Sequence, residues 1–497
     1  MTKDLHIDTK AMRAKILDLA IQGKLTDQRE EDGNARDLLK EIQAEKEKLI
    51  KEKKIKKEKH LPEITEEEKP FEIPDRWEWV RLGDIAQAVN GDRGKNYPRR
   101  EEYVASGIAW INAGHITDDG YLNADKMNYI TQNKYDSLRS GKIQRNDLLF
   151  CLRGSFGKVA RIEPFCEGAI ASSLAIIRLF NTALREYLFI YLKSPQAANE
   201  LNKYANGTAQ PNLAAKDVLK YLIPLPPLAE QQRIADKVSA LFAQLDAIDK
   251  AYEEYQELQQ AMKAKLLDLA IQGKLTDQRA EDGNARDLLK EIQAEKEKLI
   301  KEKKINKEKH LPEITEEEKP FEIPDSWEWV RLGDLTSKVG AGNTPKGGKK
   351  SGVYKESGIE FIREMNVYND GLYYDGMVYI SSELAKTRTG SAVVAGDILL
   401  NITGGSIGRC ALVPDNFVLG NVNQHVLIIR NIVTSIREYI HLVLCSPLVQ
   451  RYINTSAVGD KAGLSASKTK GFVIPLPPLV EQKRIVSKLD KLLSLEI

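Results

Sequence analysis

A long internal repeat constrains this sequence more than any other feature. Residues 14–84 and 264–334, at an offset of 250, are identical except at four positions. The similarity then becomes intermittent, and it returns last in the phrases IPLPPLAEQQRI (223–234) and IPLPPLVEQKRI (474–485). A repeat of this length predicts that the chain folds as two copies of one scaffold.

Between these phrases the two copies match only in short islands. Asp147-Leu-Leu-Phe corresponds to Asp397-Ile-Leu-Leu, and a Gly-Ser-x-Gly turn follows in each copy. Such apolar islands suit the buried core of a shared scaffold, whereas the divergent stretches are polar, Gly-rich and loop-like. We therefore expect equal scaffolds with different surfaces, which read two targets or two halves of one target.

A heptad pattern follows the first IPLPPL phrase. Apolar residues recur at alternating spacings of four and three, which predicts a coiled-coil helix over 229–270, about 63 Å long. Gly273 supplies a stop signal after it. The predicted seam comprises Ile234, Val238, Leu241, Leu245, Ile248, Tyr252, Tyr255, Met262, Leu266 and Leu269, with Gln259 as a polar member.

A second helix of this kind is split between the two ends of the chain. Ile485, Leu489 and Leu492 repeat the start of the seam, and the N-terminal residues resume it at an offset of 250. We therefore expect a circular, pseudo-twofold organisation with two long antiparallel helical elements. A shorter helix with a Glu- and Lys-rich solvent face is predicted over about 285–309 and again over 34–59.

Together these patterns predict an α+β fold with two similar globular domains separated by long antiparallel coiled-coil helices. The expected domains are mixed α/β with a β-sheet core. The predicted segments are an N-terminal helical region (1–75) that pairs with a C-terminal helix (477–497), a first domain (76–225), a central helical spacer (226–325) and a second domain (326–476).

Charge is unevenly distributed although the net charge is only +2. Residues 76–222 hold 20 Lys and Arg against 15 Asp and Glu, and residues 326–473 hold 16 against 12. Two basic blocks in an acidic frame offer two places for a polyanion, although an excess of this size is also ordinary for a domain.

Targeting and cysteine patterns indicate a cytoplasmic protein. The N-terminus has no apolar run of the signal-peptide type, and no stretch approaches the roughly 18 apolar residues of a membrane span. The four cysteines are scattered without a C-x-x-C pair, so we expect reduced, buried thiols, with metal binding as the remote alternative.

The chain lacks recognisable catalytic motifs. It has no N/D-P-P-Y/F loop of an amino-methyltransferase, no H-E-x-x-H and no G-x-S-x-G. The run GNTPKGGKK departs from the phosphate-loop pattern, because Gly347 is followed by Gly348. We therefore expect no catalytic residues and a binding role.

Cationic and amide side chains in the divergent, Gly-rich stretches are the candidates for DNA contact, since phosphates need cations and base edges need polar groups. A solvated surface role is the alternative for each one alone. The candidates are Arg93, Lys95, Tyr97, Arg99, Arg100, Arg153, Lys158, Gln210 and Asn212 in the first copy, and Lys346, Lys349, Lys350, Arg363, Lys386, Arg388, Arg409 and Lys461 in the second.

In its layout the chain resembles the specificity subunit of Type I restriction-modification systems. The resemblance is carried by the ordered duplication of W-x-W-V/L-x-L-G-D (at Trp77 and Trp327), D-x-L, G-S-x-G-K/R and L-P-P-L-x-E-Q-x-R-I. It implies a non-catalytic DNA-binding chain with two target recognition domains, each of which reads half of a split target. It also implies helices that set the spacing and dock two methyltransferase (M) subunits.

The resemblance assigns the cofactors to the partners: S-adenosylmethionine to the M subunits, and ATP and Mg²⁺ to restriction (R) subunits. A spacer helix about 63 Å long suits half-sites between one and two DNA turns apart. Because the two domains have unlike surfaces, we expect an asymmetric target. The alternatives are a coiled-coil scaffold with two protein- or glycan-binding modules and a one-component nuclease.

Overall fold

The computed structural model describes residues 7–57, 61–154, 157–205, 213–345, 352–456 and 463–494. Residues 4–253 form one compact unit, called the N-terminal unit, and residues 254–497 form the body of another, called the C-terminal unit. Each unit contains one copy of the repeat and has its own hydrophobic core. Within the described ranges, no helix combines the length and apolar character that a bilayer crossing requires.

The N-terminal unit contains α1 (Thr9–Ile21), α2 (Ala35–Lys51), α3 (Leu82–Ile85), α4 (Gln132–Ser137), α5 (Arg185–Leu192), α6 (Pro195–Tyr204) and α7 (Ala215–Val218). Its strands are β1 (Glu78–Arg81), β2 (Ala86–Asn90), β3 (Ile108–Ile111), β4 (Asn128–Ile130), β5 (Leu148–Cys151), β6 (Val159–Arg161), β7 (Gly168–Ile170), β8 (Leu174–Leu179) and β9 (Leu222–Leu225). Helix α8 (Leu228–Ile271) starts in this unit and ends in the next.

The C-terminal unit contains α9 (Ala285–Lys301), α10 (Ser382–Lys386), α11 (Arg437–Cys445), α12 (Pro447–Ser456), α13 (Ala466–Lys470) and α14 (Leu479–Ser494). Its strands are β10 (Glu328–Arg331), β11 (Thr336–Ala341), β12 (Ile359–Ile362), β13 (Val367–Tyr368), β14 (Gly371–Leu372), β15 (Val378–Ile380), β16 (Ala392–Val393), β17 (Ile398–Asn401), β18 (Cys410–Leu412), β19 (Gly420–Val422), β20 (Val426–Asn431) and β21 (Val473–Leu476).

A four-stranded antiparallel sheet is the middle layer of the N-terminal unit, with strand order β2-β8-β5-β6. Leu148 and Phe150 of β5 enter a core shared with α1, α5 and α8. The alternate residues Leu149 and Cys151 enter a second core, shared with strands β3 and β7 of a three-stranded sheet. A strand buried on both faces must be apolar at every position, which explains why the Asp-Leu-Leu-Phe island is so apolar.

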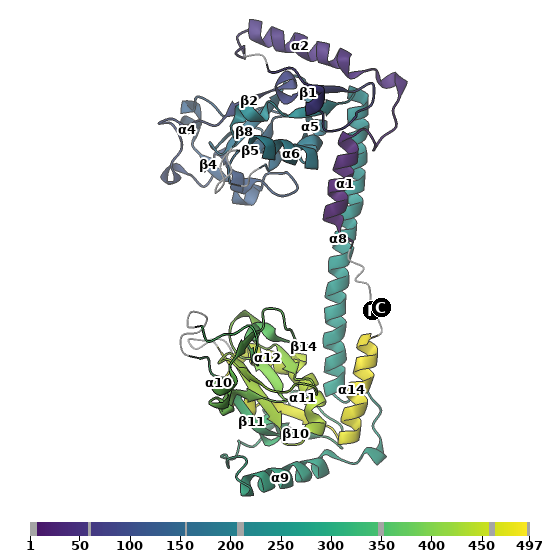
Figure 1. Ribbon diagram of the computed structural model, residues 1–497, viewed down its shortest axis with the longest axis vertical. Coiled ribbons are helices and arrows are strands. Elements are labelled where there is room, and N and C mark those ends of the chain that lie inside the picture. Colours follow the sequence, from purple (N-terminus) through teal and green to yellow (C-terminus); the bar gives the residue numbers. More distant parts are fainter. Residues whose placement is uncertain are drawn as a thin grey trace. The chain divides into compact units, whose positions relative to one another are not determined.

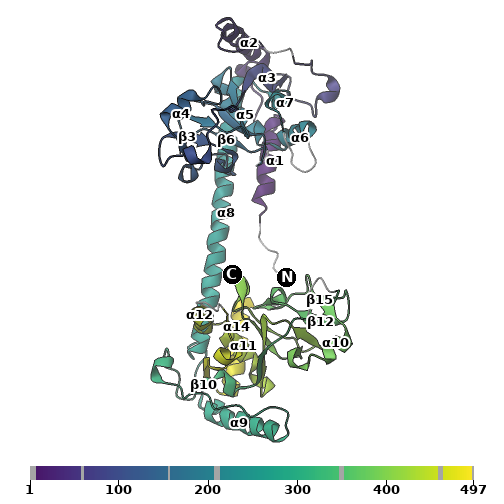
Figure 2. The same ribbon diagram turned by 90° about the vertical axis from the view of Figure 1, so that its left-hand side faces the viewer.

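The C-terminal unit repeats this layering around the sheet β11-β20-β17-β18. Leu400 of β17 enters the helix-covered core, and Leu399 enters the core on the other face. The outer sheet has the order β15-β12-β19-β16, and α10 packs against β12 and β15 through Ala385, Phe361 and Ile380 (Figure 2). The shared apolar islands thus mark the shared scaffold.

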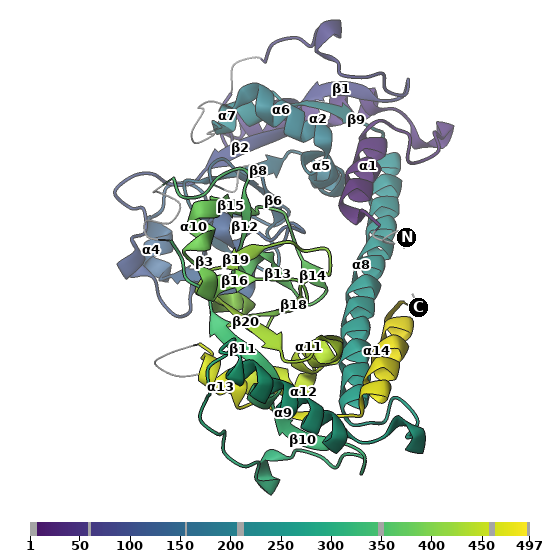
Figure 3. The ribbon, with the colours of Figure 1, turned by 60° about the horizontal axis from the view of Figure 1, so that its bottom comes forward.

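Within each unit, a short helix packs antiparallel to part of α8. Arg13 of α1 binds Asp246 and Asp249 at 2.8 and 2.9 Å, and Thr26, just beyond α1, binds Glu230 near the start of α8 at 3.1 Å (Figure 1). Helix α14 packs in the same way against the last turns of α8 (Figure 3). The α+β class and the antiparallel helix pairs are confirmed, whereas the circular, pseudo-twofold relation stays a prediction.

The predicted seam is unevenly buried. Its members Ile234, Val238, Leu245, Ile485 and Leu489 are buried. Among its remaining members, Tyr255 keeps 40% of its surface exposed, while Leu241, Ile248, Tyr252, Met262, Leu266, Leu269 and Leu492 are half-buried and Gln259 is exposed. In the last turns of α8, Leu267, Ala270 and Ile271 are buried instead, because there the helix faces the core of the unit as well as α14.

Helix boundaries differ from the sequence prediction at the same place in both copies. Helix α8 covers the expected span, but α9 ends at Lys301 rather than near residue 309, and α2 ends at Lys51 rather than at residue 59. Lys303 has a positive φ of 58°, and the N–H of Lys304 bonds back to the carbonyl of Leu299 at 2.9 Å. The helix stops there because the following Lys-rich residues bring no apolar side chain into the core.

The duplicated Trp and Glu residues form a joint between the sheet layer and the long helix. The Trp77 indole N–H donates to a carboxylate oxygen of Glu230 at 2.8 Å, and Gln28 donates to the other oxygen at 2.6 Å. Burial raises the pKa of the Glu230 carboxyl. In the C-terminal unit, Trp327 donates to Glu481 at the same distance of 2.8 Å.

The rest of the L-P-P-L-x-E-Q-x-R-I motif completes this joint. Gln231 donates to the carbonyl of Pro226 at 2.8 Å. Arg233 makes a paired hydrogen bond to Asp32, with both distances 2.6 Å, and this guanidinium holds the pKa of Asp32 below its usual range. The motif therefore fixes the direction in which α8 leaves the unit, which is a structural role.

Candidate nucleic-acid interface

Four loops of the N-terminal unit meet at one place, the N-terminal loop edge, defined by the described residues of 91–107, 152–158, 171–173 and 213–214. The N–H of Leu152 donates to the carbonyl of Ser173 at 2.8 Å, and the N–H of Leu213 donates to the carbonyl of Leu152 at 3.2 Å. Gly91 lies so close that a Cβ there would be 2.6 Å from the carbonyl oxygen of Ile170. Divergent loops thus converge on one edge of the scaffold.

A buried carboxylate fixes the longest of these loops. Asp92 accepts hydrogen bonds from the N–H groups of Arg139 and Gly94, both at 2.9 Å. These backbone donors, that of Arg139 first, hold the pKa of Asp92 below its usual range. The loop that carries Arg93 and Lys95 is therefore anchored at its base, and these two side chains are exposed.

The other candidates of the first copy have different surroundings. Arg99, Arg100 and Arg153 are exposed, whereas the Tyr97 ring packs edge-on against Trp110 with 5.2 Å between centroids. Lys158 forms an ion pair of 2.6 Å with Asp118. Gln210 and Asn212 lie outside the described residues.

The C-terminal unit has a matching C-terminal loop edge, defined by the described residues of 342–358, 402–409, 423–425 and 463–464. The N–H of Ile402 donates to the carbonyl of His425, and the N–H of Leu464 donates to the carbonyl of Ile402, both at 3.0 Å. The N–H of Gly342 bonds to the carbonyl of Val426 at 3.1 Å. The backbone frame of the two loop edges is therefore the same.

Several candidates of the second copy support this frame. Arg363 donates to the carbonyl of Gly376 at 2.5 Å, and Arg388 donates to that of Asn343 at 2.6 Å. The Arg409 guanidinium lies 4.4 Å from the centre of the Tyr368 ring. Lys386 is exposed, and Lys346, Lys349, Lys350 and Lys461 lie outside the described residues.

Sequence reasoning missed a polar cluster in the turn between β19 and β20. Asn423 donates to a carboxylate oxygen of Glu364 at 2.6 Å. His425 Nδ1 lies 2.7 Å from the hydroxyl of Thr403, and the Gln424 amide is exposed beside it. The run GNVNQHVLII could have indicated this cluster, because it places three polar residues between two buried strands.

The N-terminal unit presents different side chains at the same backbone positions. Its turn between β7 and β8 carries Ala171, Ser172 and Ser173 where the other unit has Asn423, Gln424 and His425. Amides and imidazoles offer donors and acceptors that can read base edges, whereas a short Ser or Ala leaves room for other groups. The two loop edges can therefore present different hydrogen-bonding patterns.

An ion pair at the start of the central strand, at the opposite end from the loop edge, is the same in both units. Asp147 on the N-terminal side of β5 pairs with Arg178 of β8 at 2.7 Å, and Asp397 pairs with Arg430 at 2.7 Å. The Asp147 side chain is only 2% exposed, and burial raises the pKa of its carboxyl in spite of Arg178. The D-x-L island thus contributes to the scaffold and not to the contact surface.

The family model of the Type I restriction modification DNA specificity domain matches residues 74–260 and 324–497. The chain therefore belongs to this family. A specificity chain of this kind is a recognition component and not a catalytic one, so the expectation from the sequence is confirmed. The family match does not support the alternative of a scaffold for proteins or glycans.

Two curated relatives from Escherichia coli cover nearly the whole chain. The Type I restriction enzyme EcoAI specificity subunit is 29% identical over 542 residues, which cover 98% of this chain and 89% of the relative. The EcoEI specificity subunit is 27% identical over 537 residues, which cover 97% and 88%. A solved chain from work on complex assembly and conformational transition of the type I R-M system shares the fold, with a TM-score of 0.57, 20% identity, and coverage of 85% of this chain and 91% of that chain.

Proposed function

We propose that this chain reads an asymmetric, two-part sequence in double-stranded DNA, with one half-site bound at each loop edge. In this proposal residues 76–225 and 326–476 are the two target recognition domains, and the helical segments set the half-site spacing. The observation that supports it is the contrast between Ala171-Ser172-Ser173 and Asn423-Gln424-His425 on the same backbone frame.

The chemistry of restriction and modification is assigned to partners. Two methyltransferase subunits dock on the helical segments and bring S-adenosylmethionine, while restriction subunits bring ATP and Mg²⁺. The proposed site of action is the cytoplasm, where the chain and its partners would meet DNA. The family membership and the named relatives support this assignment.

Salt dependence tests whether the partner is a polyanion. In complex with methyltransferase subunits, the logarithm of the DNA-binding constant should fall linearly with the logarithm of salt concentration, by about 0.9 per neutralised phosphate. Arg93→Ala, Arg99→Ala and Arg100→Ala together should reduce this slope by up to about 3, measured by fluorescence anisotropy with a labelled duplex.

A variant with the same charge change controls for net charge. Lys40, Lys48 and Lys51 on α2 are exposed and far in sequence from the loop edge. Changing these three to Ala should leave the slope unaltered. Equal losses of slope in the two triple variants would show that the loop edge is not the phosphate-binding surface.

Gln424 tests base reading in one half-site. Its exposed amide can donate and accept at a base edge, so Gln424→Ala should relax one position of the half-site read by the C-terminal unit, by about 1–3 kcal/mol of discrimination. Ser172→Ala is the matched change in the other unit and should affect only the other half-site. Sequencing of methylated sites in cells that carry each variant measures both effects.

A further inference from the structure

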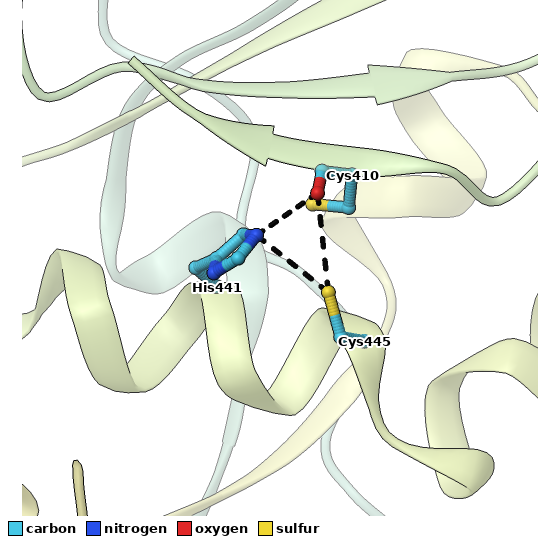
Figure 4. A group of neighbouring side chains, drawn as sticks. All are labelled: Cys410, His441 and Cys445. Carbon is cyan, nitrogen blue, oxygen red and sulfur yellow. Dashed lines mark hydrogen bonds between the residues drawn. The ribbon is translucent and has the colours of Figure 1, made fainter. Parts of the chain in front are cut away.

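Two thiols and an imidazole converge in the C-terminal unit. Cys410 opens β18, and His441 and Cys445 lie one turn apart on α11, so their side chains share one face of the helix. The three side chains point toward a common centre (Figure 4). Their Nε2 and Sγ atoms all lie within 4.8 Å of one another.

The separations match those of zinc ligands. In a tetrahedral site with Zn–S near 2.3 Å and Zn–N near 2.05 Å, the nitrogen and sulfur atoms lie about 3.6 Å apart and two sulfurs about 3.8 Å apart. The distance from His441 Nε2 to Cys445 Sγ is 3.6 Å. Cys410 Sγ needs to move by no more than about 1 Å to complete the set.

We propose that Cys410, His441 and Cys445 bind a zinc ion, which joins β18 to α11 in the C-terminal unit. Binding releases one proton from each thiol. The imidazole stays neutral, but its proton moves from Nε2 to Nδ1, so the hydrogen bond of 2.9 Å that Nε2 donates to the carbonyl of Cys410 is given up. Two thiolates balance the charge of the cation.

A pocket beside the cluster provides the fourth coordination position. It has a volume of about 500 Å³ and is lined by His441 and Cys445 together with side chains of α8, α14 and the turn between β13 and β14. The carboxyl groups of Asp370 and Glu438 belong to this lining. A water molecule from this pocket completes a tetrahedral site, as water does beside three protein ligands in other zinc proteins.

The N-terminal unit fills the same place with cation–aromatic packing instead of metal ligands. The residues at the corresponding positions are Val159, Phe189 and Lys193, and the Arg161 guanidinium lies 3.6 Å from the centre of the Phe189 ring. The shared scaffold therefore folds without ligands here. The proposed metal site belongs to the C-terminal copy alone.

Metal content of the purified full chain tests the proposal. Under reducing conditions the chain should hold a single equivalent of zinc after exposure to zinc and removal of the excess by gel filtration. Cobalt in place of zinc should give a thiolate-to-cobalt charge-transfer absorption. His441→Phe and Cys445→Ser should abolish both signals, whereas Cys166→Ser, at an exposed cysteine in the other unit, should change neither.

Two further controls show whether a loss of zinc binding comes from misfolding or from oxidation of the thiols. Phe stands at the matching position of the N-terminal unit, so His441→Phe should keep the circular dichroism of the parent chain. Bound zinc should raise the midpoint of thermal unfolding of the parent chain and not that of this variant. Zinc that stays below a tenth of an equivalent in the reduced parent chain, or a Cys410–Cys445 disulfide as the sole chemistry of the pair, would overturn the proposal.

Discussion

Replacing residues 85–222 with the corresponding segment of a relative of different specificity should change one half of the methylated sequence completely and leave the other half as it was. The two exchange points are neighbours in the structure. The N–H of Leu82 donates to the carbonyl of Tyr221 at 2.9 Å, and β1 pairs with β9 through Arg81 and Leu222. The segment thus leaves and rejoins the scaffold at one place.

The grafted segment must preserve the contacts that cross this boundary. Tyr187 in the segment donates its hydroxyl to the carbonyl of Pro224 outside it, whereas Tyr191 and its acceptor Leu222, 2.6 Å apart, both belong to the segment. In the C-terminal unit Tyr439 makes the first of these bonds, to Pro475 at 2.7 Å. A donor with Tyr at the first position should therefore dock on β9 without a buried carbonyl losing its partner.

Genome-wide mapping of methylated bases measures the outcome of this exchange. The reciprocal exchange of residues 335–473 is the matched control and should change only the other half-site. A change in both half-sites after either exchange would contradict independent reading by the two units. Loss of all methylation, with the chimera still bound to its methyltransferase subunits, would also contradict it.

The scaffold could be predicted from the sequence because its physical requirements leave repeated, local patterns. Strands buried on both faces need apolar runs, and these appear at Leu148–Cys151 and, before the polar Asn401, at residues 398–400. The helix seam was harder to predict at its far end. A heptad count identifies the side chains that face a partner helix, but Leu267 and Ile271 turn toward a core assembled from residues distant in sequence.

The contact surface could be predicted only in part. Cationic loops stand out by composition, and Arg93 and Arg100 are exposed in such a loop. The same composition does not distinguish Arg388, whose guanidinium binds the carbonyl of Asn343 at 2.6 Å. The Cys410, His441 and Cys445 cluster was missed because motif searches rely on local spacing. Cys410 lies on strand β18, about 30 residues before the helix α11 that carries the other two.

Removing the cation that pairs with the buried Asp147 should destabilise the N-terminal unit strongly. In Arg178→Met the apolar stem is kept, but Asp147 loses a partner at 2.7 Å and keeps one N–H donor, from Gln144 at 2.6 Å. An uncompensated buried carboxylate of this kind costs about 3–5 kcal/mol of unfolding free energy. Lys40→Met in the exposed pair with Asp37 should leave the stability almost unchanged.

A second substitution, at Asp147, separates the two effects of Arg178→Met: the loss of charge compensation and the loss of packing. Asp147→Asn added to Arg178→Met should recover much of the stability, because a neutral amide has no charge to desolvate and still accepts the N–H of Gln144. Burial raises the pKa of Asp147, and the loss of Arg178 raises it further. Protonation of the carboxyl removes the buried charge, so the deficit of the single variant should shrink as the pH falls from 8 toward that pKa.

Hydrogen exchange provides the measurement with an internal standard. Amide protection in β5 and β8 should fall in Arg178→Met, while protection in β17 and β20 of the C-terminal unit should be unchanged. Those strands keep their own pair, Asp397 with Arg430 at 2.7 Å. If protection fell equally in both units, the two copies would unfold as one cooperative body, and the separate cores would not be independent units of stability.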